Sequence, residues 1–434
     1  MTVMATGTDR RAPAPLDGLT ILEISSFIAA PLGGLTLAEL GADVIRIDPV
    51  GGGADLGRWP LAPSGTSLYW TGLNQGKRSV TLNFRDAEGR RLLGDLLTAS
   101  GPGGGIVLTN AGQEWLGYPA LARVRPDLIH LQIQGHRDGR AAVDYTVNAA
   151  TGFPLITGPD GLEGPVNHVL PAWDVACGLY AAVGLLAAER RRRRTGAGSA
   201  ITLALADVAL AVAGHLGYLA EAQVTGTDRP RIGNHLYGGL ARDFRTADGE
   251  RVMVVVLTRR HFADLATATG LASTFAELER LLGADFGEEG DRYRHREVIA
   301  ALLEPWFAGR TVAEVERDLA GTSVLWSRYR RFTDLVADGT LAANPLLGPI
   351  TQPGVGPLLA PGSPLAVDGT TGPRPAPVLG ADTAAVLAGL LGLSAADIGA
   401  LAGRGIIGGL GRGGGMIGDG GAVGGDPGQG APDS

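Results

Sequence analysis

The sequence predicts an α/β protein in which a large domain with a doubly wound parallel sheet is followed by a smaller α+β domain. Two observations support the large domain: short β-branched segments alternate with helical patterns from Leu19 to about Leu210, and proline or glycine marks the ends of those patterns. A third supports the smaller domain, because the chain becomes more charged after a linker near residue 225. The length of 434 residues allows two or three domains.

Six segments in the first half have the length and composition of strands. The first two enclose the helical pattern of 31–41, which opens with Pro31 and closes with Gly41, as helices tend to do. Strands separated by helices in this way favour parallel pairing. The six predicted strands are 19–24, 44–48, 79–83, 105–110, 128–133 and 200–205.

The second half supplies the smaller domain and a C-terminal segment. The expected elements are a helix over 206–222, a linker over 225–234, a hairpin over 244–257, helices near 261–283 and 296–319, a Pro- and Gly-rich stretch over 344–356 and a helix around 382–402. The predicted divisions are therefore a flexible N-terminus (1–15), a large domain (16–224), a small domain with its linkers (225–343), a C-terminal segment (344–403) and a flexible Gly-rich tail (404–434).

Composition argues against nucleic-acid and membrane partners. A net charge of −7 gives no basic surface for either. The first 15 residues lack the apolar core of a signal peptide, and no run of about 18 apolar residues occurs. Cys177 is the single cysteine, and no Cys/His cluster has the spacing of a zinc site. We expect a soluble, cytoplasmic protein without a metal centre.

Asp174 is the most informative residue, because it stands where the loop N-H-V-L-P-A-W (167–173) gives way to a long apolar helical pattern. Helix-start amides and the helix dipole favour an anion at this position, so a plain N-cap explains it structurally. The alternative is chemistry. An aspartate with an ordinary pKa of about 3.9 is already ionised at neutral pH and can act as a nucleophile without a general base.

Other candidate motifs favour structural interpretations. In 72–79, G-L-N-Q-G-K-R-S has three residues between its glycines and precedes a strand, so it is not a Walker A loop. The arginine run 190–194 suits a solvated helix end, and His215 and Cys177 suit packing. His168, six residues before Asp174, is left open between packing and donation to a developing oxyanion.

Several stretches, in order and spacing, resemble the family III CoA transferases, the group that includes formyl-CoA and carnitine CoA transferases. The resemblance spans about residues 16–407. It implies a Rossmann-like large domain completed by the C-terminal segment, a small domain, and an interlocked homodimer. The stretches are 16–24, 29–34, 37–48, 73–83, 172–178, 189–198, 344–347 and 361–364.

The resemblance also implies the site residues. By matching position, the family's catalytic aspartate falls on Asp174. Coenzyme A is expected as part of the substrate, with no permanently bound cofactor. Its contacts fall on Ile28, Ala29, Leu82, Asn83, Phe84, Arg85 and Asn110.

Five stretches differ from what most family members have, and they resemble a subgroup that moves CoA between the two carboxyl groups of one small dicarboxylate. For the acid we expect contacts from Arg137, Tyr145, Asn167 and His168, with Trp173 narrowing the pocket and helix-start amides beside Asp174 stabilising the oxyanion. The stretches are 51–60, 137–148, 166–174, 228–238 and 302–307.

Departures from the family pattern leave alternatives open. Pro49 replaces an arginine that contacts CoA in formyl-CoA transferase, and the glycine-rich lid is reduced to Gly238 and Gly239. An intermolecular transferase would use the same aspartate. An α-methylacyl-CoA racemase would have a histidine where Val143 precedes Asp144, and a non-catalytic CoA-binding protein would have no use for the charge of Asp174.

Overall fold

The computed structural model describes residues 13–99, 101, 103–112, 114–370 and 372–409. Its large unit is built on a six-stranded sheet in the order β3-β2-β1-β4-β5-β6, with every neighbouring pair parallel. The order reverses between β1 and β4, as in Rossmann-like sheets. The strands are β1 (Thr20–Ile24), β2 (Asp43–Pro49), β3 (Arg78–Leu82), β4 (Ile106–Thr109), β5 (Ile129–Gln134) and β6 (Ser199–Ala204).

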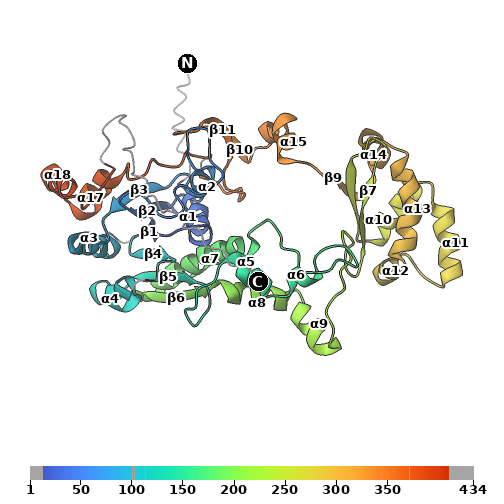
Figure 1. Cartoon of the computed structure of the whole chain (residues 1–434), viewed down its shortest axis with the longest axis horizontal. Helices are drawn as coiled ribbons and strands as arrows, with labels where there is room; N and C mark the ends of the chain where they lie inside the picture. The colour runs from blue at the N-terminus through green and yellow to red at the C-terminus, as the bar shows by residue number, and fades with distance from the viewer. Residues whose placement is uncertain (1–12, 100, 102, 113, 371, 410–434) are drawn as a thin grey trace, which may run out of the picture.

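Two helical layers cover the sheet and bury separate cores. One layer holds α1 (Ala29–Glu39), α7 (Ala172–Thr195) and α8 (Leu205–His215), which pack on β1, β4 and β5. The other holds α3 (Ala87–Thr98), α4 (Tyr118–Val124), α17 (Thr383–Leu391) and α18 (Ala395–Gly403). Figure 1 shows the C-terminal α17 lying beside α3 and β3, so the end of the chain completes this layer.

Helix α7 is long and apolar enough by composition to cross a membrane. It packs, however, against α1, α8, β5 and β6, and its inward residues Cys177 and Ala181 are fully buried. Its apolar character is therefore that of a core helix. One face remains open to solvent and carries Leu179, Tyr180 and Val183.

The smaller unit is an antiparallel three-stranded sheet covered by helices, and two connections join it to the large unit (Figure 1). Its strands are β7 (Leu240–Arg245), β8 (Arg251–Val256) and β9 (Leu325–Arg328). Its helices are α10 (Arg259–Ala268), α11 (Ala272–Leu282), α12 (Glu289–Arg294), α13 (Arg296–Ala308) and α14 (Val312–Leu319).

Short elements connect these parts. The segment after β2 contains α2 (Leu68–Leu73), and the loop between β5 and α7 contains α5 (Asp144–Ala149) and α6 (Phe153–Ile156). The remaining elements are η1 (Glu114–Leu116), α9 (Tyr218–Thr225), α15 (Phe332–Ala337), α16 (Thr340–Ala343) and the hairpin of β10 (Leu347–Gln352) and β11 (Gly356–Pro361).

All six strands predicted in the first half are confirmed, as is their parallel pairing. The hairpin expected over 244–257 is present but begins earlier, at Leu240. Several expected long helices are pairs. The helix expected over 206–222 breaks into α8 and α9 at Gly217, whose φ of 84° belongs to the left-handed region. The helix expected over 296–319 breaks into α13 and α14, where Thr311 caps α14.

The boundary predicted for the glycine-rich tail at Arg404 is too early. Ile406 and Ile407 are each 3% exposed in the core, and Ile407 forms an antiparallel bridge with Leu82, the last residue of β3. These two side chains bury apolar surface that a free tail would expose. The rest of that tail, 410–434, and most of the predicted N-terminal segment, 1–12, lie outside the described residues.

Candidate active site

The helix that carries Asp174 is capped by another carboxylate. Helix α7 begins at Ala172 after Pro171, so Asp174 lies within the first turn and is not the N-cap. Oδ2 of the buried Asp144 accepts the backbone N–H groups of Trp173 at 2.8 Å and Asp174 at 3.1 Å. The capping role expected of Asp174 thus belongs to Asp144, which leaves the Asp174 carboxylate free.

The same bonds overturn the expected source of oxyanion donors. Ala172 N–H donates to the carbonyl of Leu170 at 2.8 Å, and Val175 N–H donates to that of Pro171 at 3.0 Å. With Asp144 holding the two amides between them, the first turn of α7 has no amide left for a substrate oxygen. The sequence could not show this, because Asp144 comes from a different element, α5.

The start of α1 offers replacement donors. Gly178 lies one turn after Asp174, and a Cβ added there would stand 2.7 Å from the Ala29 carbonyl oxygen. Only glycine permits this approach, which sets the start of α1 beside the turn of α7 that carries Asp174. The backbone N–H groups of Ile28 and Ala29 have no hydrogen-bond acceptor among the described residues. They are available to a ligand.

The Asp174 carboxylate lies in a partly buried, electrostatically mixed environment. Burial, and secondarily the charge of Asp144, raise its pKa from the ordinary value to about 6, and Arg58 opposes that rise. Burial, with the Asp174 charge, also raises the pKa of the Cys177 thiol to about 12. Asp174 is therefore ionised at neutral pH while Cys177 stays a thiol, in agreement with the packing role expected for it.

Arg58, Phe27 and Tyr69 form a second part of the site that sequence reasoning missed. The Arg58 guanidinium lies 5.4 Å from the ring centre of Phe27 and 5.1 Å from that of Tyr69. Burial raises the Tyr69 pKa to about 12, with Arg58 opposing the rise and Asp174 adding to it. The Tyr69 hydroxyl is buried and has no hydrogen-bond partner among the described residues. The distinctive stretch 51–60 was the only signal, and it did not single out Arg58.

A buried ionic network lies beside Phe27 and holds its backbone in place. Arg46 of β2 binds Asp48 and Asp55, with Nη2 3.1 Å from Asp55 Oδ1. Lys77 Nζ lies 2.9 Å from Glu23 Oε1 of β1. The other oxygen of Asp55 accepts the backbone N–H of Phe27 at 3.0 Å. Since buried charges are retained only when well paired, the network fixes Phe27, which has a φ of 64°.

The predicted CoA contacts gather at the carboxyl ends of the strands. Asn110, after β4, bridges to the loop after β1: its Oδ1 accepts Ser26 N–H at 3.0 Å, and its Nδ2 donates to the Ser26 carbonyl at 2.8 Å. Ile28 and Ala29 follow in that loop. Leu82 is fully buried in β3, whereas Arg85 beyond it is exposed. This edge, where strand order reverses, is where doubly wound sheets bind their ligands.

The residues predicted for the small acid divide into three groups. Asn167 and His168 gather on Asn148, whose Oδ1 also accepts Trp173 Nε1–H at 3.1 Å. Tyr145 follows Asp144 and is 48% exposed. Arg137 is 83% exposed at its side chain and binds Asp207 at 2.7 Å. The structure thus brings Asn167 and His168 together and directs Arg137 to another carboxylate.

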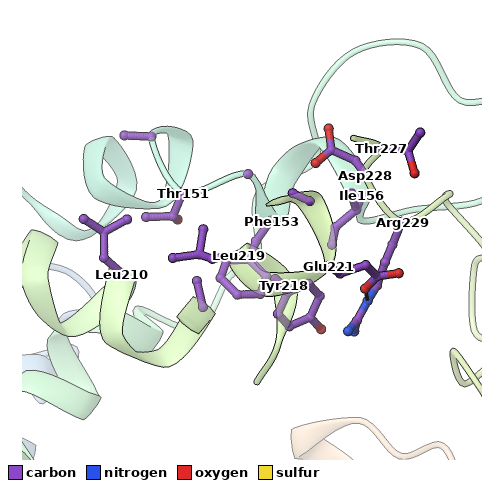
Figure 2. Close-up of a pocket in the computed structure, with 14 residues that line it drawn as sticks. Thr151, Phe153, Ile156, Leu210, Tyr218, Leu219, Glu221, Thr227, Asp228 and Arg229 are labelled. Atoms are coloured by element: carbon purple, nitrogen blue, oxygen red, sulfur yellow. Dashed lines mark hydrogen bonds and ion pairs between the residues drawn. The ribbon is translucent and has the colours of Figure 1, made fainter. Parts of the chain in front are cut away.

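Trp173 does not narrow a pocket, because its indole ring is in the core. It is 6% exposed and packs against Phe153 with ring centres 5.3 Å apart. Beyond Phe153 lies a separate cavity of about 220 Å³, where Tyr218 and Arg229 face Glu221 (Figure 2). Consecutive side chains on an α-helix leave the axis about 100° apart, so Trp173 and Asp174 point to different surroundings.

A model of the family described as CoA-transferase family III matches residues 16–383. The chain belongs to CoA-transferase family III. As members of such a family act on CoA thioesters, the CoA of the substrate is the expected ligand of the strand ends described above. Among the described residues, no group of three His, Cys, Asp or Glu side chains is placed to hold a metal ion.

Individual relatives narrow the comparison. This family III CoA transferase is 50% identical over 402 residues to the 2-methylfumaryl-CoA isomerase of Chloroflexus aurantiacus, covering 91% of this chain and 98% of that protein. It is 28% identical over 360 residues to the succinyl-CoA:mesaconate CoA-transferase of Haloarcula marismortui, covering 78% and 86%. A crystal structure of a CaiB/BaiF family protein from Brucella suis matches with a TM-score of 0.71 and 26% identity, over 87% of this chain and 99% of that one.

Proposed function

We propose that this enzyme converts 2-methylfumaryl-CoA into 3-methylfumaryl-CoA by moving CoA from one carboxyl group to the other within the same molecule. The 50% identity to the isomerase over 91% of the chain carries this proposal. The site geometry agrees with it, since Asp174 is a carboxylate freed from capping and ionised at neutral pH. The five distinctive stretches resemble the same isomerase.

The reaction begins when an Asp174 carboxylate oxygen attacks the thioester carbonyl. The C–S bond breaks, which gives a mixed anhydride and CoA thiolate. The thiolate then attacks the aspartyl carbonyl of the anhydride and forms an aspartyl-CoA thioester, and mesaconate leaves as a dicarboxylate. The Asp174 nucleophile needs no proton removed, so no catalytic base is required.

The return steps place CoA on the other end of mesaconate. Its second carboxylate attacks the aspartyl thioester and releases the thiolate, and the thiolate attacks the mesaconyl carbonyl of the new anhydride. Asp174 leaves as a free carboxylate, so atoms and charge balance without water. Each tetrahedral intermediate carries an oxyanion, for which the unbonded amides of Ile28 and Ala29 are the donors in our proposal.

The remaining parts of the proposal concern CoA and the assembly. We infer that CoA lies across the strand ends, against Ile28, Ala29, Asn110 and the segment 82–85, and that no further cofactor takes part. The chain would act as a cytoplasmic homodimer. The apolar side chains exposed on α7, Leu179, Tyr180 and Val183, support a covering partner.

Isotope transfer tests whether CoA moves within one substrate molecule or between two. The enzyme is incubated with unlabelled 2-methylfumaryl-CoA and a tenfold excess of ¹³C-labelled mesaconate, and the product thioester is analysed by mass spectrometry. The proposal expects 3-methylfumaryl-CoA without label. Labelled product would instead support intermolecular transfer, the alternative favoured by the 28% identical succinyl-CoA:mesaconate CoA-transferase. Hydroxylamine trapping should yield a hydroxamate on Asp174.

A further inference from the structure

We propose that Arg58 binds the free carboxylate of the substrate and so selects acyl-CoA thioesters that carry a second carboxyl group. This inference rests on the proposed function, which requires the site to hold a small dicarboxylate. It gives the distinctive stretch 51–60, which contains Arg58, a role in recognising the free carboxylate of the substrate. The transfer steps at Asp174 do not themselves require such a residue.

Arg58 has a charge that the folded chain does not neutralise. Its side chain is exposed and forms no ion pair with a described residue, although it acts electrostatically on Asp174. The two aromatic rings of Phe27 and Tyr69 hold the guanidinium from the sides. Rings of this kind orient an arginine while leaving its N–H groups available.

The backbone of Arg58 is held on both sides, so the guanidinium starts from a fixed position. Its N–H donates to the Asp55 carbonyl at 3.1 Å, and its carbonyl accepts the Ser67 hydroxyl at 2.5 Å. Asp55 in turn is buried, bound to Arg46 and bonded to Phe27. Asp55 therefore holds the Arg58 backbone through its own carbonyl and the Phe27 backbone through its carboxylate.

The chemistry of the site gives such a cation a use. A dicarboxylic acid that forms a thioester at one end presents an anion at the other, and the free acid carries two. A planar guanidinium donates two parallel hydrogen bonds to a carboxylate, which fixes the orientation of the carboxylate as well as pairing its charge. With Asp174 as the attacking anion, Arg58 would also offset the repulsion between two carboxylates in a partly buried site.

The other candidate arginine does not meet these conditions. Arg137 already binds Asp207 and is largely exposed, without an aromatic support in the structure. Binding a substrate would require that ion pair to open. Arg58 requires no such change.

Titration calorimetry in a non-reacting background tests the proposal without depending on turnover. We would compare Asp174→Asn with Asp174→Asn/Arg58→Gln, using 2-methylfumaryl-CoA and (E)-2-methylbut-2-enoyl-CoA, which replaces the free carboxylate with a methyl group. If Arg58 donates charged hydrogen bonds to the free carboxylate, Arg58→Gln should weaken binding of 2-methylfumaryl-CoA roughly 10- to 150-fold. Binding of the methyl analogue should weaken less than about 3-fold. Arg58→Lys should bind 2-methylfumaryl-CoA with an affinity between those of the arginine and glutamine forms, since lysine keeps the charge but not the paired N–H donors of the guanidinium.

Arg260→Gln, on the exposed surface of α10, is the matched control and should change neither affinity. Equal weakening of both thioesters by Arg58→Gln would overturn the proposal, as would unchanged binding of 2-methylfumaryl-CoA. Isomerisation by the unmodified enzyme is measured separately. Failure there contradicts the proposed function, whereas failure in the titration contradicts only the role of Arg58.

Discussion

Asp144 Oδ2 lies 3.1 Å from the backbone nitrogen of Asp174, so one buried carboxylate anchors the helix turn that carries the other. The second oxygen of Asp144 is buried and accepts no hydrogen bond within the part of the chain that the structure describes. Its charge is felt at Asp174, whose pKa rises chiefly through burial and further through this neighbour. The arrangement fixes the backbone of Asp174 and destabilises the ionised form of its carboxyl group.

Replacing Asp144 separates its capping role from its charge. Asp144→Asn keeps an acceptor for the two amides, and because it removes a negative charge it should lower the Asp174 pKa. Asp144→Ala loses both, and losing a cap costs about 1 to 2 kcal/mol of stability. Urea unfolding should therefore rank the variants with the alanine lowest. Equal stability of Ala and Asn variants would contradict the capping role.

The rate of isomerisation should rise with pH through the Asp174 pKa of about 6. Below that value the carboxyl is protonated and cannot attack, so log kcat/KM should fall by one per pH unit. Asp144→Asn should move this limb to lower pH, and Arg58→Gln should move it higher, because Arg58 opposes the rise. Initial rates from pH 4.5 to 8 give the profile. A flat profile across pH 6 would contradict ionisation of Asp174 as the controlling step.

Asp174→Asn should stabilise the protein at neutral pH. Because the folded pKa of about 6 lies above the ordinary value of 3.8, the folded state holds a proton that the unfolded state releases between these values. Stability therefore falls as pH rises through that window, by at most about 3 kcal/mol. Asparagine cannot ionise, so it removes the cost of burying a charged carboxylate at this position. Thermal unfolding should show a gain at pH 7.5 that disappears near pH 4, and a pH-independent difference would contradict it.

The sequence identified the parts of this protein whose signals are local. Alternating strands and helices predicted the parallel sheet, whereas the role of Asp174 as nucleophile followed from the family resemblance and stays a prediction. The missed features depend on contacts between distant segments. Asp144 reaches α7 from α5, and Arg58 meets Phe27 only after β1 and the loop beyond β2 come together. No spacing along the chain encodes such contacts.

Trp173 and Ile407 are residues whose local sequence context predicted the wrong environment. Next to a nucleophile, Trp173 looked like a pocket residue, but Asn148 and Phe153 draw its ring into the core. Ile407 stood at the start of a glycine-rich segment, and its burial against β3 decides that it belongs to the fold. In both cases tertiary packing outweighs the local composition.

Gly178 tests whether the close approach of α1 and α7 is needed for activity. A methyl group at Gly178 would lie 2.7 Å from the Ala29 carbonyl oxygen and 3.1 Å from Leu32 Cβ, so α1 must move. Overpacking of this kind costs about 1 to 3 kcal/mol, against a helix-propensity gain of up to about 1. Gly178→Ala should thus be less stable in urea, and kcat should fall about tenfold or more as the Ile28 and Ala29 amides shift from Asp174.

Gly94→Ala is the matched control, because Gly94 lies in the middle of α3 with open space where its Cβ would stand. Gly94→Ala should raise the free energy of unfolding by up to about 1 kcal/mol and leave kcat unchanged. If Gly178→Ala behaved like Gly94→Ala, the contact between the helices would not position the catalytic groups. If it lost stability but kept full kcat, the contact would matter for folding alone, and the oxyanion donors would have to lie elsewhere.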